Sequence, residues 1–261
     1  CSTADIVVGD SNSTTYAGNI SSQVEGTGAL LKEGTGTLTL SGDNSNYTGY
    51  IQIDQGTLQA GSTEAFGGGD FASGPYGGAY VYLATGSFLD LNGFSNAFYS
   101  LHGTGTVTDS STTPVTLELY NGSSGGSVFG GVIEDGAGKT SLLIDAGTLT
   151  LAGANTYTGA TTVKSGAGLT LNPGGTLATG ANVAVNGGTF SILNGVGQDL
   201  GALTGTSGTV EFGANTVSTA TSVSGTHDLE FDDNAQLTTA RLSGGGSITL
   251  GNSEIDAGSD N

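Results

Sequence analysis

The chain has 261 residues and a net charge of −19, from 23 acidic against four basic residues, and glycine occupies 49 positions. Nucleic acids and anionic membrane surfaces both attract basic segments, so this charge argues against either partner. Threonine, valine, isoleucine and leucine alternate through most of the sequence, which argues against a disordered chain despite its glycine content.

Cys1 is the only cysteine, so no intrachain disulfide can form. A lipidated cysteine, a tag remnant and a native residue freed from a precursor are all left open for this position. The sequence shows no secretory signal and no apolar run of about 20 residues, the length that spans a bilayer as a helix. We therefore expect a mature or excised piece that does not insert into a membrane.

Residues 36–58, GTLTLSGDNSNYTGYIQIDQGTL, set the pattern for the rest of the chain. Runs of four or five residues alternate apolar with polar side chains and end at Gly, Asn or Asp, which predicts short β-strands joined by tight turns. No segment repeats apolar residues at helical spacing, so we expect almost no helix. Asn44, Asn46 and Asn155 precede tyrosines in turns, where we expect them to bond their own backbone.

The segment FGGGDFASGPYGGAY, at 66–80, has about nine more residues than the matching unit between Leu177 and Val183. Insertions in solenoids lie in loops on one face, often the binding face, and aromatic side chains suit contact surfaces. We interpret it as an inserted Gly/aromatic loop at about 67–78; the alternative is a turn whose aromatic rings only cover the wall. The candidate binding residues are Phe66, Phe71, Pro75, Tyr76 and Tyr80.

Residues 147–169, GTLTLAGANTYTGATTVKSGAGL, repeat the first pattern closely, and a second unit recurs at 100–107, 202–210 and 241–248. Strands this short cannot bury an apolar face alone, but stacked coils share one core and satisfy each other's backbone groups. The alternation predicts ten inward residues: Leu38, Leu40, Ile51, Ile53, Leu58, Leu149, Leu151, Val163, Leu169 and Leu171.

These repeats predict an all-β fold, a right-handed parallel β-helix (β-solenoid), as a single unit over residues 1–261. At about 20–25 residues per coil, roughly ten to thirteen coils spaced about 4.8 Å apart would form a rod roughly 50–60 Å long. Glycines at the corners would supply positive φ angles. The alternative is a β-sandwich, which does not require internal repetition.

The repeated pattern resembles the passenger-associated transport repeat of bacterial autotransporters (type V secretion). Lys32 to Leu58 matches it closely, and Leu143 to Leu169 nearly as well. The resemblance implies a passenger domain exported across the outer membrane of a Gram-negative bacterium and located at the cell surface or in the extracellular space. It also implies an adhesive or self-associating scaffold, since many relatives are adhesins and a minority carry inserted enzymes.

Catalysis is not expected from this composition. The two imidazoles are His102, where matching units have Thr204 or Ser243 and a polar surface position is expected, and His227, which begins an acidic strand and is expected to be solvated. Arg241 with three lysines provides few partners for paired carboxylates. A polysaccharide-active enzyme is therefore the third hypothesis.

The acidic strand around Glu230 alternates carboxylates with Leu229 and Phe231, which places the carboxylates on one outward face. A solvated acidic surface is the favoured interpretation, and a calcium site is the alternative. The candidate calcium ligands are Asp228, Glu230, Asp232 and Asp233. No other metal or cofactor is expected.

The leading functional hypothesis is a rigid non-catalytic scaffold or adhesin. Its expected partners are host-cell or bacterial surface molecules, either protein or glycan, together with further copies of itself. The alternative is a structural subunit that stacks end to end into an extracellular filament, because unpaired strand edges at the ends of a β-helix can pair with another chain.

Overall fold

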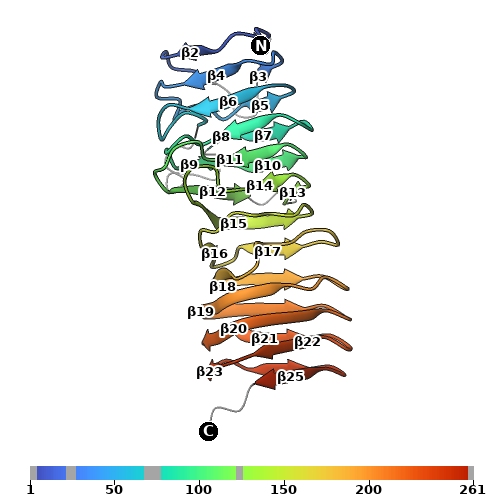
Figure 1. Ribbon diagram of the computed structural model, residues 1–261. Coiled ribbons are helices and arrows are strands. Elements are labelled where there is room, and N and C mark those ends of the chain that lie inside the picture. Colours follow the sequence, from blue (N-terminus) through green and yellow to red (C-terminus); the bar gives the residue numbers. More distant parts are fainter. Residues whose placement is uncertain (1–4, 22–27, 68–77, 122–125, 258–261) are drawn as a thin grey trace.

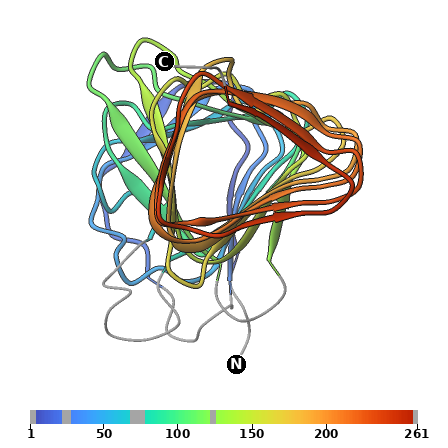
Figure 2. The same cartoon turned by 90° about the horizontal axis from the view of Figure 1, so that it is seen from below.

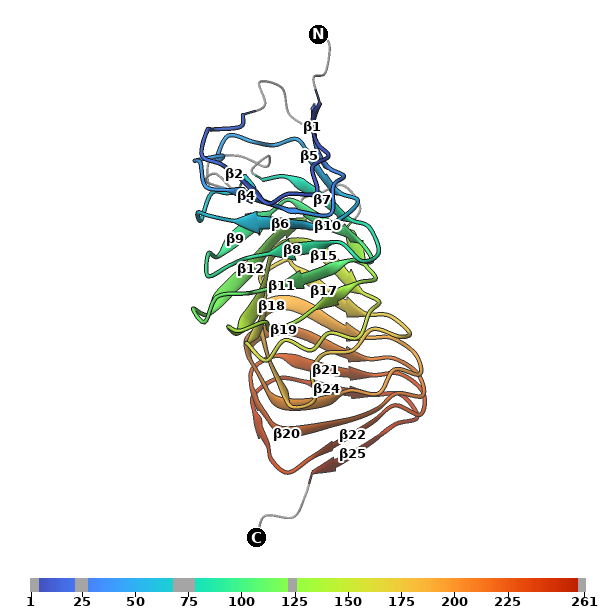
Figure 3. The ribbon, with the colours of Figure 1, turned by 45° about the horizontal axis from the view of Figure 1, so that its top comes forward.

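The computed structural model describes residues 5–21, 28–67, 78–121 and 126–257, and every regular element in these ranges is a β-strand. The coils stack along one axis (Figure 1) and enclose a roughly triangular cross-section when viewed from the end (Figure 2). The first and last strands, β1 (Ile6–Val8) and β25 (Glu254–Ala257), lie at opposite ends of the rod (Figure 3).

All strand pairings in the described ranges are parallel. This confirms the predicted parallel solenoid. The β-sandwich alternative is wrong, because its facing sheets are antiparallel.

The strands of the described residues belong to two sheets. The smaller sheet has six strands: β2 (Thr14–Tyr16), β4 (Thr37–Leu40), β6 (Thr57–Ala60), β8 (Phe88–Asp90), β11 (Thr106–Thr108) and β14 (Val132–Ile133). The larger sheet has nineteen strands, β1 and β25 together with β3 (Ala29–Lys32), β5 (Tyr50–Ile53), β7 (Tyr80–Leu83), β9 (Asn96–Phe98), β10 (Ser100–Gly103), β12 (Val115–Asn121), β13 (Ser127–Phe129), β15 (Thr140–Leu151), β16 (Thr161–Lys164), β17 (Gly168–Leu171), β18 (Ala181–Ile192), β19 (Asp199–Phe212), β20 (Val217–Gly225), β21 (Asp228–Phe231), β22 (Gln236–Thr239), β23 (Leu242–Gly244) and β24 (Ile248–Leu250).

One continuous wall of the larger sheet, called wall A, runs the length of the rod. Its twelve rungs in the described ranges are β1, β3, β5, β7, β10, β13, the second half of β15, β17, the second halves of β18 and β19, β21 and β24. At about 4.8 Å between neighbouring strands, twelve rungs give a rod of roughly 50–60 Å, as predicted.

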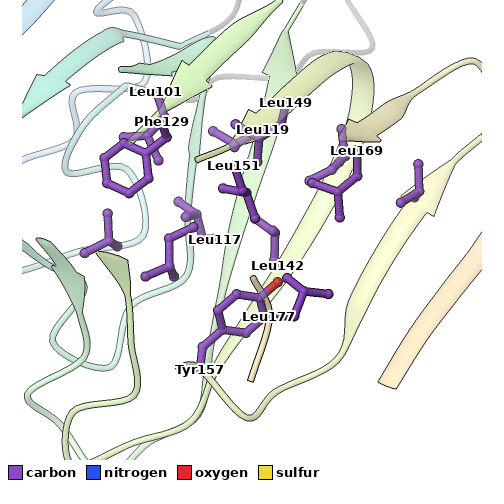
Figure 4. Close-up of a cluster of buried hydrophobic side chains, with 14 of the residues drawn as sticks. Leu101, Leu117, Leu119, Phe129, Leu142, Leu149, Leu151, Tyr157, Leu169 and Leu177 are labelled. Atoms are coloured by element: carbon purple, nitrogen blue, oxygen red, sulfur yellow. The ribbon is translucent and has the colours of Figure 1, made fainter. Parts of the chain in front are cut away.

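The core consists of apolar side chains that repeat from one coil to the next. All ten predicted inward residues are buried, with exposed fractions of 4% or less. Figure 4 shows Leu149 and Leu151 of β15 beside Leu169 of the next coil, and the rings of Phe129 and Tyr157 are buried in the same core. Burying each leucine contributes about 1.5–3 kcal/mol, so the shared core holds the coils together.

The repeat's asparagines fasten neighbouring coils to one another. Asn44 accepts a hydrogen bond from the Ile20 amide at 2.6 Å and donates to the Ala65 carbonyl at 2.7 Å, 24 residues back and 21 residues forward along the chain. Asn155 makes the same pair of contacts, to the Ile133 amide and the Thr176 carbonyl. These two residues are structural, as predicted. Asn155 also donates to the Gly153 carbonyl of its own turn at 2.9 Å, as expected, whereas both of the Asn44 side-chain bonds reach neighbouring coils instead.

Five strands in the described ranges are longer than the predicted four or five residues: β12 with 7 residues, β20 with 9, and three that are longer still. β15 and β18 have 12 residues each and β19 has 14. Each bends around a corner at a glycine with positive φ, namely Gly147, Gly187 and Gly208. Each strand pairs with the neighbouring coils both before and after its bend, so a single strand contributes to two walls of the solenoid.

The two copies of the repeat lie on different walls, which the sequence did not predict. Leu38 and Leu58 of the first copy belong to the six-stranded sheet, whereas Leu149 and Leu169 of the second belong to wall A. The shift follows β12, which pairs with both β9 and β15 and lengthens its coil. In Figure 2 the early coils are correspondingly offset from the later ones.

Candidate binding surface

The structure tests only part of the predicted aromatic loop. Phe71, Pro75 and Tyr76 lie outside the described residues, so their role stays a prediction. Phe66 is 1% exposed, and its ring centroid lies 5.7 Å from that of Phe98 inside the solenoid. Its proposed role as a surface contact is therefore wrong, because the coil turns only at the following residue, Gly67, which has a φ of +82°.

Tyr80, the remaining candidate, belongs to a ladder of tyrosines on wall A. The parallel register places Tyr50 of β5 beside Tyr80 of β7, with ring centroids 5.1 Å apart. The ring of Tyr99, just before β10, lies 4.6 Å from that of Tyr80 on the other side. Tyr50 is 50% exposed and Tyr99 only 7%, so the ladder slants from the surface into the fold.

Further apolar side chains extend this ladder into a patch, here called the aromatic surface. Tyr82 is 47% exposed and Val128 53%, and both point outward from wall A. Tyr82 pairs in register with His102, and β13, which carries Val128, pairs with the same strand, β10. The aromatic surface consists of Leu31, Tyr50, Tyr80, Tyr82, His102 and Val128.

Sequence reasoning did not identify Tyr50, Tyr82 or Val128, although a signal was present. In YIQI and YVYL the alternation points the isoleucine, valine and leucine inward, which leaves the tyrosines outward. Outward positions on a soluble protein are usually polar. Tyrosine at consecutive outward positions could therefore have marked this surface.

Wall A changes character along the rod. Beyond Val128, its outward positions in register are Thr150 and Thr170, and farther along they are Glu211 and Glu230. The upper part is thus apolar and aromatic, the middle is rich in hydroxyls and the lower part is acidic. His102 adds no charge at neutral pH, because burial lowers its pKa, although a backbone hydrogen bond with Val128 acts in the opposite direction.

The four acidic candidates for calcium do not gather into a cluster. Asp228 accepts hydrogen bonds from the amide and hydroxyl of Ser247, both at 2.7 Å, and these bonds lower the pKa of its carboxyl. Asp233 accepts from the Asn252 amide at 3.3 Å, while Glu230 and Asp232 are exposed. Within the described ranges, no three His, Cys, Asp or Glu side chains are placed to hold one metal ion.

His227 is not solvated, contrary to the prediction. Its side chain is 4% exposed, neither ring nitrogen has a hydrogen-bond partner, and burial lowers its pKa while Asp228 raises it. The imidazole adjoins a hollow of about 140 Å³ between the last two coils, which Ser224, Ser243 and Ser247 also line. The residue turns inward at the corner before β21, where Gly208 occupies the corresponding corner of β19.

The fold and surface together define the class of protein: a scaffold built from repeats that presents long, flat walls. Residues 30–60 and 144–171 match the passenger-associated-transport-repeat family. The chain is also 34% identical, over 248 residues, to a protein of Brucella suis biovar 1 (strain 1330) named "Adhesin BmaC autotransporter"; the match covers 90% of this chain and 7% of that protein's length. No solved structure matches significantly.

These matches identify the chain as a solenoid segment of an autotransporter passenger with passenger-associated transport repeats. Its place is accordingly the cell surface or the extracellular space, after export across the outer membrane. In the part of the chain that the structure describes, no helix is long and apolar enough to cross a membrane.

Proposed function

We propose that this segment is a rigid, non-catalytic scaffold of an adhesin and that its walls contact host-cell or bacterial surface molecules. The observation that carries the proposal is the 34% identity to a named adhesin over 90% of the chain. The continuous core supports it, because a rod with one shared interior keeps its outward side chains in fixed register. Contacts along flat walls are shallow, so many copies would act together through avidity.

The test is adhesion of beads that carry the chain at graded surface density. We expect binding to cultured epithelial cells that rises steeply with density, and no binding by beads that carry albumin. Binding no better than albumin at every density would contradict the adhesin. A variant without residues 67–78 tests the predicted loop in the same assay, and undiminished adhesion would exclude the loop from the binding surface.

The absence of a catalytic role is part of the proposal, and the placement of the imidazoles supports it. His102 lies on β10 and His227 just before β21, six rungs apart on wall A. Neither nitrogen of His227 contacts a hydroxyl that it could activate. Incubation with acidic and neutral polysaccharides, with and without calcium, should release no product; any released oligosaccharide would overturn this part.

A further inference from the structure

We propose that the aromatic surface of wall A is a binding site for an extended, uncharged glycan; the inference rests on the adhesin function proposed above and names its ligand class. The surface covers five consecutive rungs, β3, β5, β7, β10 and β13, and its six residues carry no formal charge at neutral pH. No other described part of wall A presents aromatic rings outward.

Charge favours a neutral ligand. On a chain of net charge −19, an anionic polymer or a second copy of the chain is repelled at long range. Glu33 and Asp54, the residues that directly follow β3 and β5, lie at the edge of the aromatic surface and add to the local negative potential. The Gln52 amide nitrogen donates to the Asp54 carboxylate at 2.9 Å, which orients both side chains. Their oxygens can accept further hydrogen bonds from sugar hydroxyls, so the same rim that repels anions can hold an uncharged glycan.

The shape of the surface favours an extended polymer over a small molecule. The rungs repeat at about 4.8 Å along a flat wall, so equivalent contacts recur along a line. Tyrosine combines an apolar ring with a polar hydroxyl, which matches the apolar face and hydroxyl rim of a pyranose. The rings of Tyr50, Tyr80 and Tyr99 already pack on one another, so ordering them on binding costs little conformational entropy.

The experiment is affinity electrophoresis of the whole chain in native gels that contain dextran, galactomannan, xyloglucan or hydroxyethylcellulose. Alginate and hyaluronan form the anionic arm. We expect at least one neutral polysaccharide to retard the chain and neither anionic polymer to do so. The double variant Tyr50→Thr/Tyr82→Thr should bind at least tenfold more weakly, because it removes two exposed aromatic rings. Threonine is the replacement because it occupies the equivalent outward positions farther along wall A.

Phe88→Thr is the matched control, because Phe88 is 40% exposed but lies on β8 in the other sheet. It should bind like the unmodified chain, and urea denaturation should show that all variants remain folded. The inference is overturned if no neutral polysaccharide retards the chain, if the double variant binds undiminished, or if alginate and hyaluronan bind equally well.

Bead adhesion with the same variants separates this inference from the adhesin itself. If the beads adhere but no polysaccharide retards the chain, the glycan proposal is overturned, whether or not adhesion depends on Tyr50 and Tyr82. The adhesin function would then stand, with a protein as the partner. Concentration-dependent dimers that the double variant abolishes would assign the aromatic surface to a second copy. Glycan binding by a chain whose beads never adhere would support the site and contradict the adhesin.

Discussion

At the scale of single residues, the repeat conserves its geometry through buried polar groups as well as through leucines. Asn44 and Asn155 are 1% and 2% exposed, and each joins a backbone amide of the preceding coil to a carbonyl of the next. The tyrosine that follows is also buried: the Tyr47 hydroxyl donates to the Tyr50 carbonyl at 2.6 Å, and the Tyr157 hydroxyl lies 2.7 Å from that of Thr161. The asparagine of the repeated motif therefore links three successive coils by hydrogen bonds.

Replacing Asn44 by alanine should destabilise the solenoid by about 2–6 kcal/mol. The Ile20 amide and the Ala65 carbonyl would both lose their partner, and each unsatisfied buried group costs about 1–3 kcal/mol. Urea denaturation followed by circular dichroism measures the loss. Asn46→Ala is the control, because Asn46 is exposed and should change stability by less than about 0.5 kcal/mol. Equal losses of stability in the two variants would show that the hydrogen bonds of Asn44 between coils do not stabilise the solenoid.

His227 should make stability depend on pH. Burial holds its folded-state pKa below the ordinary value of 6.5, so the unfolded chain binds the proton more readily. Stability contributed by the neutral imidazole is therefore present above pH 6.5 and is lost as pH falls from there toward the folded-state pKa. Urea midpoints measured between pH 8 and pH 5 should show this loss.

The carboxylates titrate in the same experiment, so the comparison with His227→Phe isolates the imidazole. The phenylalanine variant should lose less stability than the unmodified chain between pH 7 and pH 5.5, since it has no proton to gain. Parallel stability curves for the two proteins would show that the buried imidazole is not responsible.

At the scale of elements, glycines at the corners decide how closely one coil can approach the next. Gly103, at the end of β10, has a φ of +100°, and a Cβ there would lie 2.0 Å from the Leu83 carbonyl oxygen of the preceding coil. Gly86, in the turn after β7, has a φ of +81° but nothing within 4 Å of a Cβ. Both positions require a positive φ angle, but only Gly86 has room for a side-chain methyl group.

Gly103→Ala should therefore cost more than about 3 kcal/mol, because the clash with a backbone carbonyl adds to the left-handed strain. Gly86→Ala should cost only about 1 kcal/mol, the strain alone. Thermal denaturation of both variants measures the difference. Equal losses would mean that the coils can separate to admit the methyl group, and the close approach would not matter for stability.

The sequence could predict the elements better than their corners. Alternation and self-similarity gave the short strands, the parallel stacking and all ten inward residues, because a strand's period of two is fixed by covalent geometry. They could not place Phe66 or His227, since a side chain beside a corner turns inward or outward according to where the glycine bends the chain. The sequence also could not predict that the second copy of the repeat lies one wall away from the first, because β12 has no counterpart in the repeated pattern.

At the scale of the whole molecule, the rod is a strongly charged body with little internal compensation. The ion pairs of the described residues all involve Lys164, which bonds Asp145 and lies 4.0 Å from Glu118. Lys32 is 1% exposed and donates to the carbonyls of Gly34 and Gln55. Most carboxylates therefore repel one another without a neighbouring cation, and folding brings them closer together than they are in the unfolded chain.

Salt should consequently stabilise the solenoid. Raising sodium chloride from 0.01 M to 0.3 M shortens the screening length from about 30 Å to about 6 Å, which removes most repulsion between coils while barely affecting the bonded Lys164–Asp145 pair. The thermal midpoint should rise over this range and then level off, and potassium chloride should act identically. A midpoint that falls would mean that ion pairing outweighs repulsion, and one that climbs steadily into molar salt would point instead to strengthened apolar burial.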